Sequence, residues 1–382
     1  MKSATRDIKI YFILLGFFSF LFLSCKEESN SVTPPVEGPS FEMNVTFAPI
    51  EVKSTDGKVN LLYSVQIEDF EKQGYKLKDF QVLNSANSGM LCSIKDTLTY
   101  LLITKENISA EDYPLREYSN FRMSVGLVLD PSQVPQKIKH KLILAKDGKE
   151  ETFEGTETTV SQQQPSVISA PLKGERFISG NSTTILNNIH PAFQMKYKGM
   201  TRVPERFCVD WNKIDDAGNY FNGDYQLCES WYVYGEKVYA VADGQVVSVK
   251  DGMPDQSPVF TQPIPTTLFD GEGNSIVIHI NGGYVVYGHL IPNSITVKPG
   301  QIVKNGDVIG KVGNSGDSDA PHLHFGLHTD FPYYISEGLP YYINTLEKTG
   351  STGKMFDPYI KLVMPETHLN ELVENWGVYN FK

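Results

Sequence analysis

Short apolar runs separated by glycine- and aspartate-containing turns occur along most of this 382-residue chain. Residues 58–65 and 121–129 are two such runs in the first half, and Asp56-Gly57 and Asp147-Gly148 are turn signals near them. No long segment there repeats its apolar residues with the 3.6-residue period of a helix, and short runs between turns are typical of antiparallel β-structure. The sequence therefore predicts an all-β protein, with an N-terminal β-sandwich at 40–160.

The second half of the chain keeps this β-character but contains more aromatic residues and glycines. Residues 237–249 are two apolar runs around Asp243-Gly244, a dipeptide typical of tight hairpin turns. Residues 297–313 continue the pattern, and a polar stretch with three consecutive glutamines at 162–164 precedes this half. We therefore predict a linker at 161–175, an antiparallel β-sheet domain at 176–345 and a C-terminal extension at 346–382.

The first 24 residues have the pattern of a secretory signal. A basic leader is followed by an almost wholly apolar stretch at 11–23, which is shorter than the roughly 20 residues that a membrane-spanning helix needs. Ser24-Cys25 at its end resembles a bacterial lipobox, which implies cleavage before Cys25 and a lipid on its sulfur. We therefore predict a lipoprotein signal peptide at 1–24, a flexible tether at 25–39 and a membrane anchor through Cys25.

The residues after Cys25 bear on the location of the protein. The triplet Lys26-Glu27-Glu28 resembles the acidic signal with which Bacteroidetes-type bacteria place lipoproteins on the cell surface. An outer-membrane lipoprotein of the cell envelope is expected, facing either the periplasm or the exterior. An ordinary signal peptide with an incidental cysteine is the alternative.

Charge and cysteine content limit the partners of the chain. It has 34 Lys and Arg against 45 Asp and Glu, a net charge of −11, whereas binding to nucleic acid needs clustered positive charge. Nucleic acid is therefore not expected as a partner. With Cys25 assigned to the lipid, three cysteines remain, an odd number for an oxidising compartment. Cys208 and Cys228 are the candidates for a disulfide, with buried free thiols as the alternative.

Two of the eight histidines lie in His322-Leu323-His324-Phe325, behind the glycine-rich run 313–316. If this segment is a strand, alternation puts both imidazoles on one face and the two apolar side chains on the other. A lone His-x-His is more often structural, but a third histidine, His289, ends another apolar run in Tyr287-Gly288-His289-Leu290. Together these histidines can hold a metal and act on what it binds.

Four segments, in this order, resemble the lysostaphin-type zinc endopeptidases of bacterial cell walls: 241–247, 283–290, 297–310 and 313–325. The resemblance implies a small antiparallel β-fold with a groove over the sheet and one Zn²⁺ on its floor. It also implies that His324 ligates the zinc and that His289 and His322 do the acid/base work. Catalytic zinc keeps three protein ligands and leaves a fourth position for water, and an imidazole near its ordinary pKa can accept and return a proton.

The remaining ligands depart from the His-x-x-x-Asp pattern that most members of this family carry. Asp210 is in place, but Arg206 stands where the histidine would be, and arginine cannot ligate zinc. The segment resembles a branch of the family with an Arg-Phe-x-x-Asp-Trp motif, in which a histidine farther upstream serves. This resemblance implies His190, Asp210 and His324 as the metal ligands; a thiolate of Cys208 is a less favoured alternative.

These observations predict a zinc-dependent endopeptidase that hydrolyses peptide bonds of bacterial peptidoglycan through a metal-bound water, with histidine acid/base catalysis. The peptidoglycan substrate comes from the resemblance alone. The alternative is a catalytically silent family member that binds cell wall or regulates a partner enzyme, expected if His190 does not complete the site. Residues 297–310 also resemble biotinyl and lipoyl carrier domains, but the acceptor lysine is missing and the histidines would have no role.

Overall fold

The computed structural model describes residues 42–68, 70–95, 103–105, 120–182, 190, 195–197, 200–260, 270–357 and 360–382. Strands dominate these ranges, and the helices are short 3-10 turns at Glu71–Gln73, Pro131–Gln133, Cys228–Ser230 and Tyr333–Ile335. The prediction of an all-β protein is therefore confirmed. No helix in these ranges is long and apolar enough to span a membrane. The predicted signal peptide, tether and lipidation site at Cys25 lie outside the described residues.

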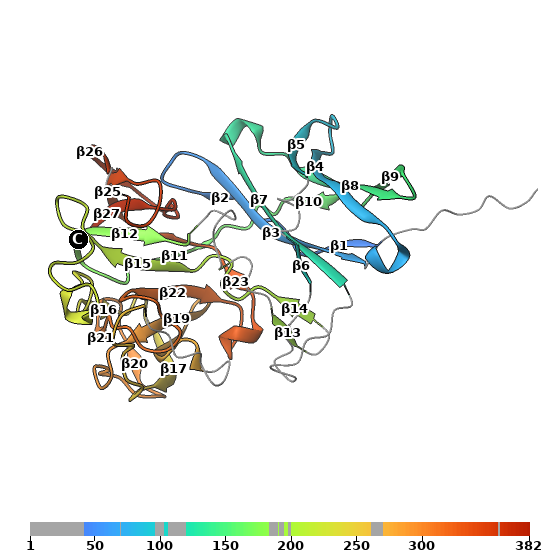
Figure 1. Cartoon of the computed structure of the whole chain (residues 1–382). Helices are drawn as coiled ribbons and strands as arrows, with labels where there is room; N and C mark the ends of the chain where they lie inside the picture. Colours follow the sequence, from blue (N-terminus) through green and yellow to red (C-terminus); the bar gives the residue numbers. More distant parts are fainter. Residues whose placement is uncertain are drawn as a thin grey trace, which may run out of the picture. The chain divides into compact units, whose positions relative to one another are not determined.

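Two five-stranded sheets enclose one hydrophobic core in the first part of the chain (Figure 1). Strand β8 shows why: alternate residues, among them Ile138, Leu142 and Leu144, are buried, while the residues between them are only partly buried. Leu61 and Val65 of one sheet share the core with Phe80 and Leu142 of the other. One sheet has the order β1-β3-β7-β6 with β2 on β3, and the other β10-β8-β4-β5 with β9 on β8. The strands are β1 (Met43–Phe47), β2 (Val52–Lys53), β3 (Val59–Glu68), β4 (Lys76–Asn84), β5 (Met90–Lys95), β6 (Ile103–Lys105), β7 (Asn120–Leu129), β8 (Lys137–Lys146), β9 (Lys149–Glu154) and β10 (Thr158–Thr159).

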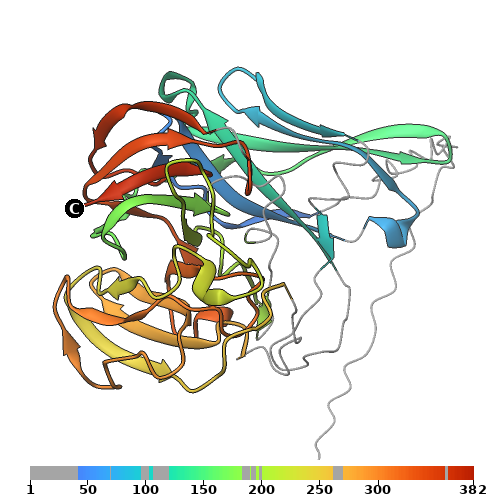
Figure 2. The same cartoon turned by 60° about the vertical axis from the view of Figure 1, so that its left-hand side comes forward.

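A sheet of eleven strands dominates the rest of the chain, in the order β20-β17-β18-β19-β22-β15-β12-β27-β25-β26, with β23 on β22. The three strands from 346–382, drawn in red in Figure 2, continue this sheet beyond β12. Its strands are β12 (Gly174–Gly180), β15 (Val209–Lys213), β17 (Gly244–Lys250), β18 (Asn274–Ile280), β19 (Gly283–Leu290), β20 (Ile302–Val303), β22 (Leu323–His328), β23 (Gly338–Leu339), β25 (Leu346–Ser351), β26 (Lys361–His368) and β27 (Gly377–Phe381).

Three two-stranded ladders complete the described fold. Strand β11 (Ser166–Ile168), from the predicted linker, runs parallel to β24 (Tyr341–Ile343). The other ladders pair β13 (Met195–Tyr197) with β14 (Met200–Arg202) and β16 (Lys237–Tyr239) with β21 (Val308–Lys311).

The two hydrophobic cores meet near β2. Ile50, Val52 and Leu62 belong to the same buried cluster as the side chains under the large sheet. The amide of Lys53 also donates to the hydroxyl of Tyr342 at 3.1 Å. The β-rich first part therefore packs directly on the second.

Strand β22 lies between β19 and β15 and carries the residues on which the site is built. Leu323 and Phe325 are buried in the core below the sheet, so the alternation of the strand turns His324 to the opposite face. Pairing with β15 sets Asp210 opposite His324, and pairing with β19 sets Gly288 opposite the same residue. The register of the sheet thus brings together residues from three distant parts of the sequence.

Candidate functional site

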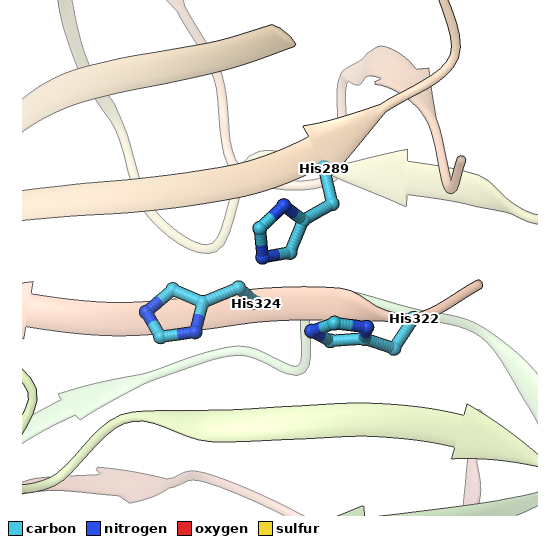
Figure 3. Close-up of side chains that lie close together, drawn as sticks. All are labelled: His289, His322 and His324. Atoms are coloured by element: carbon cyan, nitrogen blue, oxygen red, sulfur yellow. The ribbon is translucent and has the colours of Figure 1, made fainter. Parts of the chain in front are cut away.

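Three histidines from two neighbouring strands converge over the large sheet. His322 lies just before β22 and His324 within it, and Figure 3 shows His289 reaching toward both from the end of β19. The ring centroid of His289 is 4.6 Å from that of His322 and 5.9 Å from that of His324. The predicted acid/base pair and the predicted ligand of the His-x-His motif are therefore in one place.

His289 is held in a restrained geometry. Its φ of +59° lies in the left-handed region, which a residue other than glycine adopts only when its surroundings enforce it. Its Nδ1–H donates to the carbonyl of Ser315 at 2.7 Å, which leaves Nε2 as the nitrogen with a free lone pair. Burial, together with the neighbouring imidazoles of His322 and His324, holds the pKa of His289 well below its usual range. At neutral pH this imidazole is a base.

His322 is oriented in a similar way from the strand below. Its Nδ1–H donates to the carbonyl of Ala320 at 2.8 Å, so that Nε2 again faces the site. That Nε2 lies 3.5 Å from Oδ1 of Asp210. His322 therefore touches both the other acid/base candidate and a predicted metal ligand.

His190, Asp210 and His324 form a second group that shares His324 with the first. One potential ligand atom from each lies within 4.8 Å of the others. Nε2 of His190 is 3.3 Å from Oδ2 of Asp210, and Nδ1 of His324 is 3.0 Å from Oδ1. The Nδ1–H of His190 faces the carbonyls of Asn181 at 3.0 Å and Cys208 at 3.3 Å, which leaves Nε2 to face the carboxylate. The structure thus places His190 where the missing ligand is expected.

The charges in this second group balance one another. Burial would raise the pKa of Asp210, but His190 and His322 outweigh it and hold that pKa well below its usual range. Burial likewise opposes protonation of His190 and His324. Asp210 nevertheless raises the pKa of His190, and Glu272 raises the pKa of His324 well above its usual range. A metal that binds these nitrogens must therefore displace the protons that Asp210 and Glu272 favour on the imidazoles.

The residues present fit a catalytic zinc ion. Two imidazoles and one carboxylate are a common donor set for zinc that keeps an open coordination position. The Nδ1–H bonds from His190 to backbone carbonyls are the outer contacts that commonly orient a ligating histidine. Nε2 of His324 is buried and has no hydrogen-bond partner among the described residues.

Two carboxylates beside His324 were not predicted from the sequence. Glu205 and Glu272 form a third group with His324, with one ligand atom of each within 4.8 Å of the others. Burial raises the pKa of Glu205 to about 7. Glu205 directly precedes Arg206, and Glu272 lies two residues before β18, so no spacing motif marked either one.

Arg206 is not a metal ligand and does not lie on the surface. It is 1 % exposed, its Nη2 donates to Oε2 of Glu337 at 3.1 Å, and its guanidinium lies over the ring of Phe47 at 5.1 Å. The residue that replaces the family's usual histidine is therefore half of a buried ion pair.

Cys208 and Cys228, the candidates for a disulfide, are both free and buried in different surroundings, as the alternative of buried free thiols has it. Sγ of Cys208 lies 3.9 Å from Nε2 of His328, whereas Sγ of Cys228 lies 3.4 Å from the carbonyl of Gln256. Burial raises the pKa of the Cys208 thiol to about 11, which argues against the alternative of a thiolate ligand.

Part of the chain matches a known protein family. Residues 231–334 match the model of peptidase family M23. The matched range contains His289, His322 and His324, while His190 and Asp210 precede it.

Parts of the chain are also similar to solved structures. The catalytic domain of the antimicrobial peptidase lysostaphin from Staphylococcus simulans is 26 % identical over 31 % of this chain and 86 % of that one, with a TM-score of 0.20. A putative peptidase M23 from Pseudomonas aeruginosa is 14 % identical over 72 % and 93 %, with a TM-score of 0.24. A zinc-containing peptidase from Vibrio cholerae is 15 % identical over 79 % and 86 %, with a TM-score of 0.22.

The motif order, the histidine cluster and the matched range lead to the same family. Peptidases of family M23 depend on zinc, and the donor set described above suits that ion. Over residues 231–334, the chain therefore matches the zinc metallopeptidases of family M23.

Proposed function

We propose that this protein is a zinc-dependent endopeptidase that hydrolyses peptide bonds of bacterial peptidoglycan. The observation that carries the proposal is the overlap of two groups at His324: His190 and Asp210 on one side, His289 and His322 on the other. Three residues are available to hold the zinc, and two more histidines stand beside them with one ring nitrogen each directed into the site.

Each group has a distinct chemical task. Bound zinc lowers the pKa of water and polarises a carbonyl oxygen. His289 is neutral and presents the lone pair of Nε2, so it accepts the proton of the attacking water. His322 presents Nε2 from beside the neighbouring strand, where it would stabilise the oxyanion through an Nε2–H when its ring is protonated, and the proton that His289 has accepted would pass to the leaving amine. Asp210 holds a negative charge next to His190, His322 and His324 and keeps this cluster of imidazoles together.

The proposal also covers the substrate and the location of the enzyme. Peptidoglycan peptides are the substrate class that the lysostaphin-type motifs at 241–325 imply. We further propose that a lipid on Cys25 holds the enzyme at the outer membrane, where peptidoglycan or its fragments are within reach.

A digest with matched variants tests the proposal. The full-length chain, purified in detergent and loaded with zinc, should release peptide fragments with new amino termini from purified peptidoglycan, as measured by mass spectrometry. His289→Ala and His322→Ala should each retain zinc and lose activity by about 10²–10⁴-fold, the usual contribution of a positioned acid or base. His324→Ala should lose the metal itself.

Two results would contradict these assignments. A zinc-loaded wild-type chain that binds peptidoglycan without cutting it would support the catalytically silent alternative. If His322→Ala emptied the metal site while His324→Ala kept it full, the roles of the two histidines would be reversed.

A further inference from the structure

A buried carboxylate lies behind His324, on the side away from Asp210. Glu272 is 6 % exposed, and its Oε1 is 3.9 Å from Nε2 of His324. Among the described residues, neither Nε2 of His324 nor Oε2 of Glu272 has a hydrogen-bond partner. Buried polar atoms in folded proteins are almost always paired. A donor nitrogen and an acceptor carboxylate that face each other in this way are one small movement from a charge-assisted hydrogen bond.

The strand next to His324 is shaped to admit this carboxylate. A Cβ atom at Gly288 would lie 2.2 Å from Oε2 of Glu272 and 3.3 Å from Cβ of His324. Gly288 is not among the residues with positive φ, so its backbone conformation does not require glycine. A side chain at this position would instead displace the carboxylate of Glu272 from its place beside His324.

The tautomer of His324 determines whether it can ligate a metal through Nδ1. Nδ1 lies 3.0 Å from Asp210 and so faces the other two candidate ligands. If Nδ1 gives its lone pair to zinc, the proton of the neutral ring must be on Nε2. A carboxylate that accepts this Nε2–H fixes the orientation of the ring and makes Nδ1 a stronger ligand.

We infer that Glu272 is a positioning residue of the zinc site, whose carboxylate accepts the Nε2–H of His324 and holds Nδ1 toward the metal. The inference rests on the proposed ligand set of His190, Asp210 and His324. Three other groups lie close to this pair, and one of them, the hydroxyl of Tyr333, interacts with the carboxylate of Glu272. The carboxylate of Glu205 belongs to the same cluster, and the thiol of Cys208 interacts with His324, but a neutral thiol is a weak acceptor.

Zinc affinity is the direct readout. The full-length chain is stripped of metal and titrated with zinc against a chelator of known affinity. Glu272→Ala should weaken zinc binding by about 10–100-fold, the usual cost of losing an outer carboxylate partner. Glu272→Gln should fall between wild type and Glu272→Ala, because its amide oxygen still accepts a hydrogen bond but carries no charge. Glu205→Gln and Cys208→Ser are the matched comparisons, and each should retain more zinc affinity than Glu272→Ala.

Thermal unfolding of the metal-free proteins separates positioning from a structural role. Glutamine has the shape of glutamate, so Glu272→Gln should keep the unfolding temperature of the metal-free wild type while its zinc affinity falls. Equal zinc affinity in wild type, Glu272→Gln and Glu272→Ala would overturn the inference and leave the proposed function intact. A loss in Glu205→Gln or Cys208→Ser instead would assign the role to that residue. A wild-type chain that binds no zinc would overturn the proposed function and this inference together.

Discussion

Replacing Arg206 by methionine should destabilise the fold strongly and leave the zinc site intact. The side chains of Arg206 and Glu337 are each 2 % exposed and joined at 3.1 Å. When one partner of such a buried pair is removed, the other charge remains in a medium that solvates it poorly. The methionine side chain retains much of the arginine's apolar contact with Phe47, so the main loss is electrostatic.

The size of the effect follows from the contacts that Glu337 keeps. Breaking a buried pair on one side typically costs about 3–5 kcal/mol. Oε2 of Glu337 also accepts the amide N–H of Val203 at 3.2 Å, and Arg202 lies 3.9 Å from Oε1. Because these partners remain, we expect a loss at the lower end of this range, about 3 kcal/mol of unfolding free energy for Arg206→Met. Glu337→Gln alone should cost a similar amount, because it leaves the guanidinium without a counter-charge.

A double-mutant cycle isolates the pair. Arg206→Met with Glu337→Gln removes both charges and keeps an acceptor for the Val203 amide, so the double variant should be more stable than either single one. The assay is urea unfolding of the four metal-free proteins, followed by tryptophan fluorescence, with zinc stoichiometry measured on the folded proteins. Strictly additive losses, or a loss below about 1 kcal/mol in Arg206→Met, would refute a buried, coupled pair. Loss of zinc from a folded Arg206→Met protein would place Arg206 in the metal site.

Three further outcomes are expected. His190→Ala should lower zinc affinity steeply and abolish turnover in parallel, since Asp210 would then have one histidine co-ligand; full zinc and wild-type turnover would mean that the third ligand lies elsewhere. Cys25→Ala should release the protein from membranes and remove fatty-acid labelling, and unchanged fractionation would exclude a lipid anchor. Burial lowers the pKa of His140 to about 4, so between the ordinary value of 6.5 and 4 the unfolded chain binds a proton that the folded chain does not. The free energy of unfolding should therefore fall by about 1.4 kcal/mol per pH unit as pH drops through this window. His140→Gln retains a partner for the hydroxyl of Tyr63 and should flatten that slope. Urea unfolding of both proteins at pH 7 and pH 5 measures the difference.

The sequence was sufficient to predict the strand that carries the site. In 322–325, alternation alone separates two imidazoles from two apolar side chains, and the structure buries Leu323 and Phe325 on the face opposite the site. Alternation does not, however, say which strands pair. That residues 346–382 would extend the large sheet through β27 on β12 depends on contacts between strands about 200 residues apart, which no local pattern encodes.

Two carboxylates of the site were not predicted from the sequence, for one physical reason. Glu272 and Glu205 are single carboxylates without a spaced partner, and each looks like an ordinary surface residue in the sequence. They become part of the site because β22 pairs with β19 and β15. This pairing brings His324 close to both carboxylates and Gly288 close to Glu272. The role of Arg206 could not be predicted for the same reason, since its partner Glu337 is 131 residues away in the chain.

The way these groups are buried also bears on the choice between an enzyme and a silent scaffold. A buried polar atom without a partner costs about 1–3 kcal/mol, and a residue other than glycine at positive φ costs of order 1–3 kcal/mol. His324 and Glu272 show the first feature and His289 the second, all within one cluster. A scaffold that only binds cell wall gains nothing from these costs, and apolar replacements would remove them. A metal held by Nδ1 of His324 would give that nitrogen a partner and direct the Nε2–H to the carboxylate of Glu272, and the strained His289 lies in the same cluster. The retained strain is therefore an argument for chemistry at this site.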